Sequence, residues 1–362
     1  MFAVGRDAVF QKILERVFTF SELNLMLQAQ SLLSICIPTY NRPNELTETL
    51  RILGEQFDAL SFGDQVLIDI IVSDNNSPST QIATIFNTWA ECRPNAVLHI
   101  QQSNVGPTLN FEYCYQYSRG KFIFILSDDD HLTQGSLSLI LESLKSDDPD
   151  ILFLPFFPLS NPGNENSTAR LKIERDVFLE KTGLLPTLIS ACIFKRNMIA
   201  PYLGRYLDTN MHHFYYFLCG VETGQSFVYL NRQILFSPYD DNSGGYNWFK
   251  VFAGDFFCII NEFPCIKVDK KILDRIKQEM FSRRIIPNYV NRKINGHAIS
   301  NRFTKTSNLE IIYLITRHCH GLFAYWLLFL PIVFIPSLAL IVLKKIYIDF
   351  RKVCMKFRVS SV

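Results

Sequence analysis

The chain has 362 residues, of which 48% are hydrophobic, so it can bury a large core and does not have a disordered composition. Its 36 basic and 34 acidic side chains give a formal net charge of +2, which makes no general case for binding nucleic acid. The charge is divided unevenly, because residues 1–268 hold 19 basic and 29 acidic side chains whereas residues 269–362 hold 17 and 5. This asymmetry predicts two electrostatically different bodies.

Nine cysteines are spread along the chain without any C-x-x-C pair. This spacing disfavours a zinc site and a disulfide framework and favours a reducing compartment. Acidic residues come early in the N-terminal stretch, and no apolar run precedes a small-residue cleavage site, so no secretory signal is expected. The first 268 residues are therefore predicted to face the cytosol.

Residues 1–30 carry apolar side chains at spacings of three and four, which predicts an amphipathic helix ahead of the main fold. Five apolar runs of strand length follow: Leu32–Pro38, Val66–Val72, Val97–Gln101, Phe122–Leu126 and Ile151–Leu154. Four segments between them are predicted to be helices: Asn44–Gln56, Thr80–Trp89, Thr108–Tyr117 and Leu137–Leu144. Continuous apolar strands that alternate with helices predict an α/β fold, with a mostly parallel sheet flanked by helices on both faces.

Residues 31–268 are predicted to form one domain, with a first half over 31–155 and a second half over 156–268. The polar stretch at 161–168 is expected to be a surface loop between them. The second half is expected to hold a strand near Thr187–Phe194, a helix near His212–Cys219 and a strand at Ser226–Leu230. A basic helical region is predicted over residues 269–320, and a basic tail over 344–362.

Residues 321–343 contain no charged side chain over 23 positions, which exceeds the roughly 20 needed to cross a bilayer. This predicts an apolar membrane segment, with a buried core helix as the alternative. Basic residues flank the segment on both sides, which favours both ends lying on the cytoplasmic side. Pro331 and Pro336 are expected to break the segment into a re-entrant hairpin, so that it anchors the protein in one leaflet.

Polar residues follow three of the predicted strands, where a parallel sheet binds its ligands. These segments are Pro38-Thr39-Tyr40-Asn41-Arg42, Ser73-Asp74-Asn75-Asn76-Ser77 and Ser127-Asp128-Asp129-Asp130-His131. Three consecutive carboxylates repel one another unless a cation balances them, and Mg²⁺ usually takes one or two protein carboxylates together with substrate phosphates. The triplet therefore predicts a divalent cation, Mg²⁺ or Mn²⁺, with a solvated acidic turn at a helix start as the alternative.

Four motifs stand in order along the chain: SICIPTYNRPNEL, IIVSDNNSPS, QQSNVGPTLNFE and GKFIFILSDDDHLTQGSL. Together they resemble the nucleotide-sugar domain of family 2 glycosyltransferases with the GT-A (Rossmann-like) fold, over residues 31–235. Within the family, the chain is similar to bacterial enzymes of the abequosyltransferase type that build O-antigen or capsule repeat units. The resemblance implies an inverting, metal-dependent transfer of a sugar from a nucleotide-sugar donor to a glycan acceptor, expected to be lipid-linked, in bacterial surface polysaccharide synthesis.

The resemblance also implies roles for individual residues. Donor contacts are expected from Pro38, Thr39, Arg42, Asp74, Asn104, Gly106, Asn110, Asp128 and Asp129. Asp74 would hydrogen-bond the base, and Asp128 would hold the ribose or sugar. Asp130, together with Asp128, would hold the metal on the diphosphate. For Arg42, a solvated position at a helix start is the alternative to a phosphate contact.

The catalytic base is where the chain departs from the family, which usually places a Glu-Asp pair at the start of a helix that leads to a Gly and a short strand. No Glu-Asp dipeptide occurs in the chain, and the register of that pair falls on His212-His213. Histidine is a competent base near neutral pH. His213 is therefore predicted to be the base, with His212 or Asp208 as substitutes and Glu222 as a remoter candidate. A structural or acceptor-binding histidine pair is the alternative.

Two further polar segments are candidates for acceptor contacts. Lys195 and Arg196 follow a predicted strand and are expected to meet an anionic acceptor or the donor phosphate, unless they are simply solvated. The Tyr239–Trp248 stretch combines aromatic and turn residues, which is typical of a sugar platform or lid and equally of a plain surface loop.

Two other functions stay open at the level of sequence. A nucleotidyltransferase on a related sheet would also use carboxylates and metal, but it typically has a Gly-rich basic loop after the first strand, which PTYNRP is not. A non-catalytic, membrane-bound nucleotide-sugar sensor is compatible with the missing Glu-Asp pair. For the enzyme, the basic C-terminal region predicts a membrane surface with anionic lipids as partner, at the cytoplasmic face of the bacterial inner membrane.

Overall fold

The computed structural model describes residues 31–157, 169–237, 247–295, 307–343 and 345. The chain divides into two compact units: unit 1 comprises Met1–Pro238 with Cys265–Asp269, and unit 2 comprises Tyr239–Pro264 with Lys270–Val362. The helices within residues 250–262 pack with the later helices of unit 2, so this division differs from the boundary expected at residue 268. The predicted N-terminal helix, the polar loop at 161–168 and the C-terminal tail lie outside the described residues, apart from residue 345.

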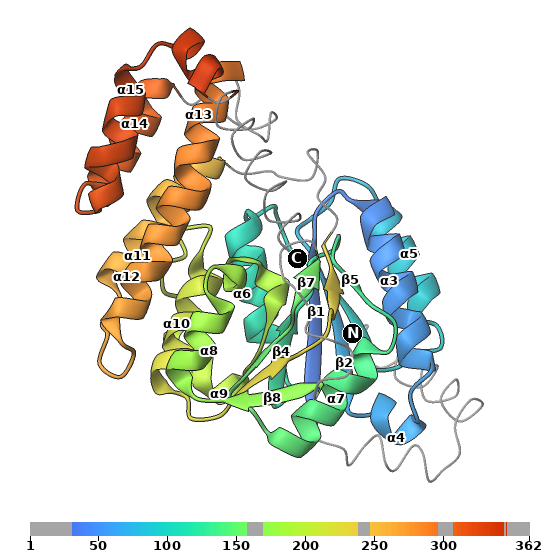
Figure 1. Cartoon of the computed structure of the whole chain (residues 1–362). Coiled ribbons are helices and arrows are strands. Elements are labelled where there is room, and N and C mark those ends of the chain that lie inside the picture. Colours follow the sequence, from blue (N-terminus) through green and yellow to red (C-terminus); the bar gives the residue numbers. More distant parts are fainter. Residues whose placement is uncertain (1–30, 158–168, 238–246, 296–306, 344, 346–362) are drawn as a thin grey trace, which may run out of the picture. The chain divides into compact units, whose positions relative to one another are not determined.

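Unit 1 is built on an eight-stranded sheet with the strand order β3-β2-β1-β4-β9-β6-β10-β8 (Figure 1). Its strands are β1 (Leu33–Thr39), β2 (Ile68–Asp74), β3 (Ala96–Ile100), β4 (Phe122–Ile125), β6 (Ile151–Phe153), β8 (Arg170–Ile173), β9 (Cys192–Lys195) and β10 (Phe227–Leu230). β1 pairs in parallel with β2 and β4, and β2 with β3, whereas β9 runs antiparallel to β4 and β6. The predicted mostly parallel α/β sheet is confirmed.

Helices cover both faces of this sheet, since every residue of β1 and β4 is buried. In Figure 1, α3 and α5 lie on one side of the sheet and α6 on the other. Pro43 and Pro107 open α3 and α6, where the missing N–H costs no helical hydrogen bond. The helices of unit 1 are α3 (Pro43–Asp58), α4 (Phe62–Gln65), α5 (Gln81–Ala90), α6 (Pro107–Tyr117), α7 (Ser136–Asp147), α8 (Arg175–Thr182), α9 (Arg196–Ile199) and α10 (His212–Thr223).

Shorter elements complete unit 1 and carry the chain around the edges of the main sheet. Three 3₁₀ turns are present in the described part of this unit: η1 (Leu185–Thr187), η2 (Ile189–Ala191) and η3 (Ala200–Tyr202). A small second sheet has the order β5-β11-β7, formed by β5 (His131–Leu132), β11 (Leu235–Phe236) and β7 (Phe156–Phe157). Its strand β5 begins directly after the acidic triplet, so the pairing of β5 with β11 fixes the chain on the C-terminal side of that triplet.

Unit 2 is helical in its described residues. Its elements are η4 (a π-helix, Lys250–Asp255), α11 (Phe256–Glu262), α12 (Lys270–Glu279), η5 (a π-helix, Met280–Ile285), α13 (Ile286–Asn295), α14 (Asn308–Cys319), η6 (a π-helix, Tyr325–Phe329) and α15 (Leu330–Phe334). α12, η5 and α13 run on without a break. This stretch buries several apolar side chains, and basic residues lie between them in the sequence. The buried side chains include Leu273, Ile276, Phe281 and Tyr289.

In the part of the chain that the structure describes, no helix combines the length and the apolar character that crossing a membrane requires. The single apolar segment expected over residues 321–343 is therefore corrected to shorter helical pieces. α15 ends at Phe334, Ile335 is extended with φ −69° and ψ 128°, and helix resumes at residues 337–343. Pro336 explains this break, because a proline disfavours the helical conformation of the residue before it. Pro331 does not break the chain and lies in the first turn of α15.

Candidate active site

The carboxyl ends of β1, β2 and β4 bring the polar segments that follow them to one edge of the sheet. Thr39 at the end of β1 is the register partner of Asp74 at the end of β2. Asp128 lies three residues beyond the end of β4, and its Oδ2 accepts a hydrogen bond from Thr39 Oγ1 at 2.7 Å. Pro38, which is also a predicted donor contact, is buried within β1. The structure therefore joins the first and last of the four motifs directly.

Arg42 binds two carboxylates of the acidic triplet at once. Its Nη1 donates to Asp128 Oδ1 at 2.7 Å, and its Nη2 donates to Asp129 Oδ2 at 2.8 Å. Thr49 on α3 adds a hydrogen bond of 2.7 Å from its Oγ1 to the backbone carbonyl of Asp128. The Arg42 side chain is 25% exposed, so the alternative of a fully solvated arginine at the helix start does not describe it. Arg42 and Thr49 hold the triplet from the α3 side.

Asp130 is held from the opposite direction by the segment that precedes β9. Ser190 Oγ donates to Asp130 Oδ2 at 2.6 Å and accepts from the backbone N–H of Ser127 at 2.9 Å. Ser127 in turn donates through its Oγ to Asp129 Oδ1 at 2.6 Å. The chain on both sides of the triplet is thus fixed, and Asp128 and Asp130 are only 3% and 1% exposed.

Burial dominates the electrostatics of this carboxylate cluster. It raises the pKa of Asp128 to about 7, although Arg42 opposes the shift, and it raises the pKa of Asp130 to about 6, with the Asp129 charge adding to the effect. Burial also disfavours the charged form of Arg42, but the attraction of Asp128 and Asp129 outweighs this and raises the pKa of Arg42.

A divalent cation fits this cluster chemically. When all three carboxylates are ionised, the single guanidinium leaves two negative charges uncompensated. The carboxylate oxygens are also the hard ligands that Mg²⁺ and Mn²⁺ prefer. Within the described residues, no group of three or more His, Cys, Asp or Glu side chains is arranged to hold a metal by itself. An ion at Asp128 and Asp130 would therefore need further oxygen ligands from a bound substrate or water.

The second motif folds into a turn beside β2. Asp74 Oδ1 accepts from the backbone N–H of Ser77 at 3.1 Å and from Ser77 Oγ at 2.5 Å. Ser77 Oγ also accepts from the backbone N–H of Asn41 at 2.8 Å, so the first and second motifs are linked. A hollow of about 290 Å³ opens beside these turns, where α3 and α5 begin. Its lining residues are Pro43, Asn44, Thr80, Gln81, Thr84 and Ile85.

The third motif is held against the second by amide side chains. Asn75, which is 2% exposed, donates through Nδ2 to Asn104 Oδ1 at 3.0 Å, and Asn104 Oδ1 also accepts from the backbone N–H of Gly106 at 2.9 Å. Gly106 has a φ of +85°, a conformation that side chains disfavour, and it directly precedes α6. Asn110 on α6 accepts from Ser73 Oγ at 2.7 Å through its Oδ1. Asn104, Gly106 and Asn110 therefore border the same edge of the sheet as Asp74.

The two histidines proposed for the base open α10 but are deeply buried. His212 is fully buried, and neither of its ring nitrogens has a hydrogen-bond partner in the described chain. His213 is 7% exposed, its Nε2 lies 3.0 Å from the carbonyl oxygen of Thr187, and its Nδ1 has no described partner. Since the carbonyl can only accept, Nε2 carries the hydrogen and Nδ1 the lone pair.

Burial also changes the acid–base behaviour expected of these histidines. It lowers the pKa of His212 to about 3, with the His213 charge adding to the effect, and it lowers the pKa of His213 to about 4. The sequence predicted an imidazole that titrates near neutral pH. In the structure, both histidines have a pKa well below that range. Both rings are neutral at physiological pH, and of the two only His213 has any solvent access.

The other candidates for base and acceptor contacts lie elsewhere. Asp208 is exposed on the segment before α10. Glu222 accepts from the backbone N–H groups of Lys267 at 2.6 Å and Val268 at 3.1 Å, which is a structural role. Lys195 binds Asp148 at 2.9 Å, and it lies at the opposite edge of the sheet because β9 runs antiparallel to β4.

Arg196 follows Lys195 at that same opposite edge, where its backbone N–H donates to the carbonyl of Lys121. The expectation that these two basic residues meet a donor phosphate is therefore not supported by their position. Of the Tyr239–Trp248 stretch, only residues 247 and 248 lie inside the described part of the chain.

Comparison with known proteins agrees with this geometry. The family model described as "Glycosyl transferase family 2" matches residues 34–203, a range that includes all three strand ends and the segment before β9. Residues 34–203 form a family 2 glycosyl transferase domain. The prediction of that family from the four motifs is confirmed.

Curated relatives of this glycosyl transferase domain come from bacteria. Abequosyltransferase RfbV of Salmonella typhimurium is 30% identical over 116 residues, which cover 32% of this chain and 33% of RfbV. The GalNAc(5)-diNAcBac-PP-undecaprenol beta-1,3-glucosyltransferase of Campylobacter jejuni is 29% identical over 110 residues, which cover 30% of this chain and 33% of that protein. The matched part thus spans about a third of each of these relatives.

The fold is also shared with a solved glycosyltransferase. The mannosyltransferase PcManGT of Pyrobaculum calidifontis, in complex with GDP-Man and Mn²⁺, aligns with a TM-score of 0.53 and 13% identity, over 92% of this chain and 96% of that one. At this identity, the likeness establishes the fold alone.

Replacing Arg42 by methionine is expected to lower the free energy of unfolding by about 3 kcal/mol at about pH 8, since two largely buried carboxylates lose their cation. The loss should shrink at about pH 5. The pKa of Asp128 is raised above its unfolded value of 3.8 to about 7, so Asp128 is protonated in the folded state below pH 7 and needs no cation there. Urea unfolding at the two pH values measures the difference.

Arg51→Met is the matched control for this substitution, since Arg51 pairs with Glu48 and Glu55 on the exposed face of α3. It is expected to change stability little at either pH, because all three partners stay in water. An equal effect of the two substitutions would contradict the buried ion-pair network at Arg42.

Proposed function

We propose that unit 1 transfers a sugar from a nucleotide-sugar donor to an acceptor hydroxyl, with inversion at the anomeric carbon and with a divalent cation. The observation that carries this proposal is the buried cluster of Asp128, Asp129, Asp130 and Arg42 at the carboxyl edge of β1 and β4. Open α/β sheets bind their ligands at this edge. The family match over residues 34–203 supports the same class of reaction.

The donor is proposed to lie along the three strand ends. Its nucleoside would occupy the side of Thr39 and Asp74, near the hollow between α3 and α5. Asn104, Gly106 and Asn110 border the same edge and would contact the nucleotide and sugar. The diphosphate would then reach the acidic triplet, where Arg42 also has solvent access.

Asp128 and Asp130 are proposed to hold Mg²⁺ or Mn²⁺ on the diphosphate. In PcManGT, Mn²⁺ accompanies a nucleotide-sugar, which supports the same combination here. When bound, such an ion stabilises the negative charge that develops on the leaving phosphate. This chain's own contribution is to keep the carboxylates in place through Thr39, Arg42 and Ser190.

His213 is proposed as the base that takes the proton from the acceptor hydroxyl at its Nδ1. The unused lone pair on Nδ1 favours His213 over the exposed Asp208, and the 7% exposure of the residue favours it over the fully buried His212. Nδ1 itself is buried, so side chains around it have to move before an acceptor hydroxyl reaches it. With a pKa of about 4, the imidazole is a weak base. It would accept the proton only as the new glycosidic bond forms.

The acceptor is proposed to be a lipid-linked glycan, and the site of action the cytoplasmic face of the bacterial inner membrane. The name of the Campylobacter relative includes an undecaprenol-linked acceptor, and that of RfbV an abequosyl transfer. Anchoring through the C-terminal region, in keeping with its excess of basic residues, belongs to the same proposal.

Thermal unfolding in the presence of a panel of nucleotide-sugars, each with and without Mn²⁺ or Mg²⁺, tests the donor site. A ligand at about 100 times its Kd stabilises the folded state by about 2.7 kcal/mol, and only donor together with cation should reach this level. Transfer of radiolabelled sugar to a bacterial lipid extract then tests the reaction. Binding without any transfer would point to the nucleotide-sugar sensor instead, and no stabilisation by any donor would end the proposal.

A further inference from the structure

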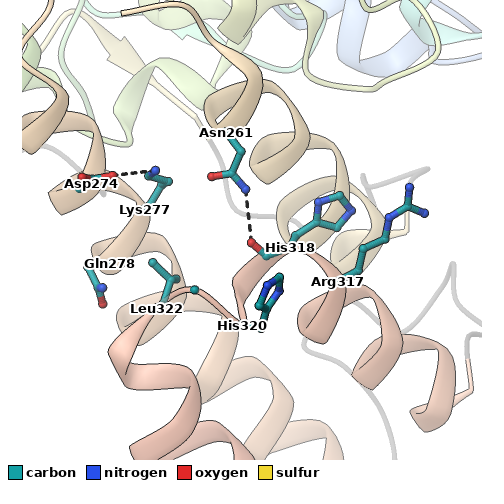
Figure 2. A pocket seen from close by; sticks show the side chains of 9 residues that line it. Asn261, Asp274, Lys277, Gln278, Arg317, His318, His320 and Leu322 are labelled. Atoms are coloured by element: carbon teal, nitrogen blue, oxygen red, sulfur yellow. Dashed lines mark hydrogen bonds and ion pairs between the residues drawn. The ribbon is translucent and has the colours of Figure 1, made fainter.

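Unit 2 contains a hollow of about 430 Å³ that plays no part in the donor site. It is formed by α11, α12, α14 and the turn that follows α14, and its lining residues are Asn261, Asp274, Lys277, Gln278, Arg317, His318, His320, Gly321 and Leu322. Figure 2 shows Arg317, His318 and His320 on one side of the hollow and Lys277 and Gln278 across from them. Nitrogen-bearing side chains thus dominate the lining.

The charge of this hollow is positive because one cation has no counterion. Lys277 is paired with Asp274 at 2.7 Å, so these two side chains cancel. Arg317 is exposed at the end of α14 and makes no ion pair with any carboxylate in the described chain. Asn261 Nδ2 donates to the carbonyl of His318 at 3.3 Å, which fixes this end of α14. A guanidinium at the edge of a polar hollow is suited to an oxyanion such as a phosphate.

The helical segment that begins at Phe323, beside the hollow, presents large apolar side chains to solvent. Phe323 is 73% exposed, Trp326 57% and Leu327 58%, at spacings of three and four residues. Trp326 Nε1 donates to the carbonyl of His320 at 2.8 Å, so the indole is held at the surface by the backbone that lines the hollow. Farther along, Phe334 and Leu338 are 77% and 79% exposed. Apolar patches of this kind mark interaction sites.

We propose that this face of unit 2 docks on a lipid bilayer, with the helical segment Phe323–Leu327 inserted at the interface and a lipid phosphate held at the edge of the hollow by Arg317. Aromatic side chains next to a cation suit the boundary between acyl chains and headgroups, and the excess of basic residues over 269–362 is complementary to an anionic surface. The inference rests on the proposed membrane location of the enzyme and names the surface responsible. It requires no helix that spans the membrane.

Sedimentation of the full chain with vesicles tests this surface. The unaltered protein is expected to bind mixed phosphatidylglycerol and phosphatidylcholine vesicles more tightly than phosphatidylcholine alone. Arg317→Glu should weaken binding to the anionic vesicles by at least about fivefold, since each surface cation adds about 1 kcal/mol of attraction. Phe323→Asp should weaken binding to both kinds of vesicle.

Two variants serve as matched controls. Arg283→Glu makes the same charge change in unit 2 at a side chain that is 77% exposed and outside the hollow. Val177→Asp also replaces an exposed apolar side chain by aspartate, at a residue of unit 1 that is 52% exposed. Val177→Asp should bind vesicles as the unaltered protein does, and Arg283→Glu should lose clearly less binding to anionic vesicles than Arg317→Glu. Equal losses in Arg283→Glu and Arg317→Glu would overturn the headgroup site, and unchanged binding of Phe323→Asp would overturn the insertion.

Measuring donor binding in the same variants tests the docking surface and the proposed function independently. Arg317→Glu and Phe323→Asp lie outside unit 1, so thermal stabilisation by nucleotide-sugar and cation should be unchanged, which shows that unit 1 still folds. An unchanged helical circular dichroism signal shows the same of unit 2. Vesicle binding without any donor binding would leave the docking surface standing and remove the glycosyltransferase proposal. Donor binding without vesicle binding would do the reverse.

Discussion

Asp130→Asn is expected to lower the rate of sugar transfer by about 10²- to 10³-fold and to remove the extra thermal stabilisation that Mn²⁺ gives in the presence of donor. The substitution keeps the size of the side chain and an oxygen that can accept from Ser190 Oγ, so the turn before β9 should stay in place. What it removes is a negative charge in a buried position beside Asp128 and Asp129. A cation held by those charges loses affinity when one of them is gone.

Asp147→Asn is the matched control for this substitution, because Asp147 ends α7 in the same unit and pairs with Arg170 at 3.6 Å, away from the strand ends. Its transfer rate and its response to Mn²⁺ should equal those of the unaltered protein. If Asp130→Asn keeps the Mn²⁺-dependent stabilisation, the assignment of the cation to the triplet fails.

His213→Gln is expected to lower the transfer rate by about 10²- to 10⁴-fold while donor binding, followed by thermal unfolding, stays unchanged. Glutamine can still donate to the carbonyl of Thr187, as His213 Nε2 does, so the start of α10 should remain folded. The group that is lost is the lone pair on Nδ1. A reduced rate with intact donor binding separates a base from a residue that positions the donor.

The pH dependence of the rate gives a second measure of the same group. A base works in its deprotonated form, and the pKa of His213 is lowered by burial to about 4, so no loss of rate attributable to His213 is expected until the pH approaches that value. His99→Gln is the control, since His99 stacks on Tyr117 with ring centroids 4.2 Å apart and lies on β3. A normal rate in His213→Gln would return the role of base to another residue.

The strands β1 and β4 of unit 1 were predictable because they are buried on both faces. A short, continuous apolar run such as Phe122–Leu126 is typical of a strand with both faces covered, and the observed β4 lies within it. Strand direction could not be predicted in this way, because a buried parallel strand and a buried antiparallel strand have the same apolar sequence pattern. The reversal of β9 could therefore not be predicted, and it places Lys195 at the opposite edge of the sheet from the one expected.

The candidate site was predictable where it follows strand ends and not where it depends on distant contacts. The acidic triplet and Thr39 come directly after apolar runs, so their meeting follows from the parallel sheet. Ser190 lies 60 residues from Asp130 in a segment without a motif, and no spacing pattern points to it. The burial of His213 was equally hidden, because the aromatic residues that follow it on α10 are read from the sequence only as apolar.

The boundary between the two units shows a similar limit. Charge changes sharply after residue 268, and that change alone predicts a boundary there. Packing instead follows apolar side chains such as Phe256, Phe257 and Ile260, which are buried on α11, a helix that packs against α12 and α14. Composition and contact therefore place the boundary at different residues.

The hydrogen bonds from the backbone of Lys267 and Val268 to Glu222 determine how unit 1 can be isolated. A shortened protein that ends at Pro238 would keep the buried Glu222 carboxylate but lose both N–H groups that donate hydrogen bonds to it. Residues 265–269 are thus part of unit 1, although they follow its first 238 residues only after residues 239–264 of unit 2. A shortened protein that contains unit 1 alone therefore has to retain residues 265–269. They can be joined to residue 238 by a linker that replaces the helices at 250–262, or they can be supplied as a separate peptide.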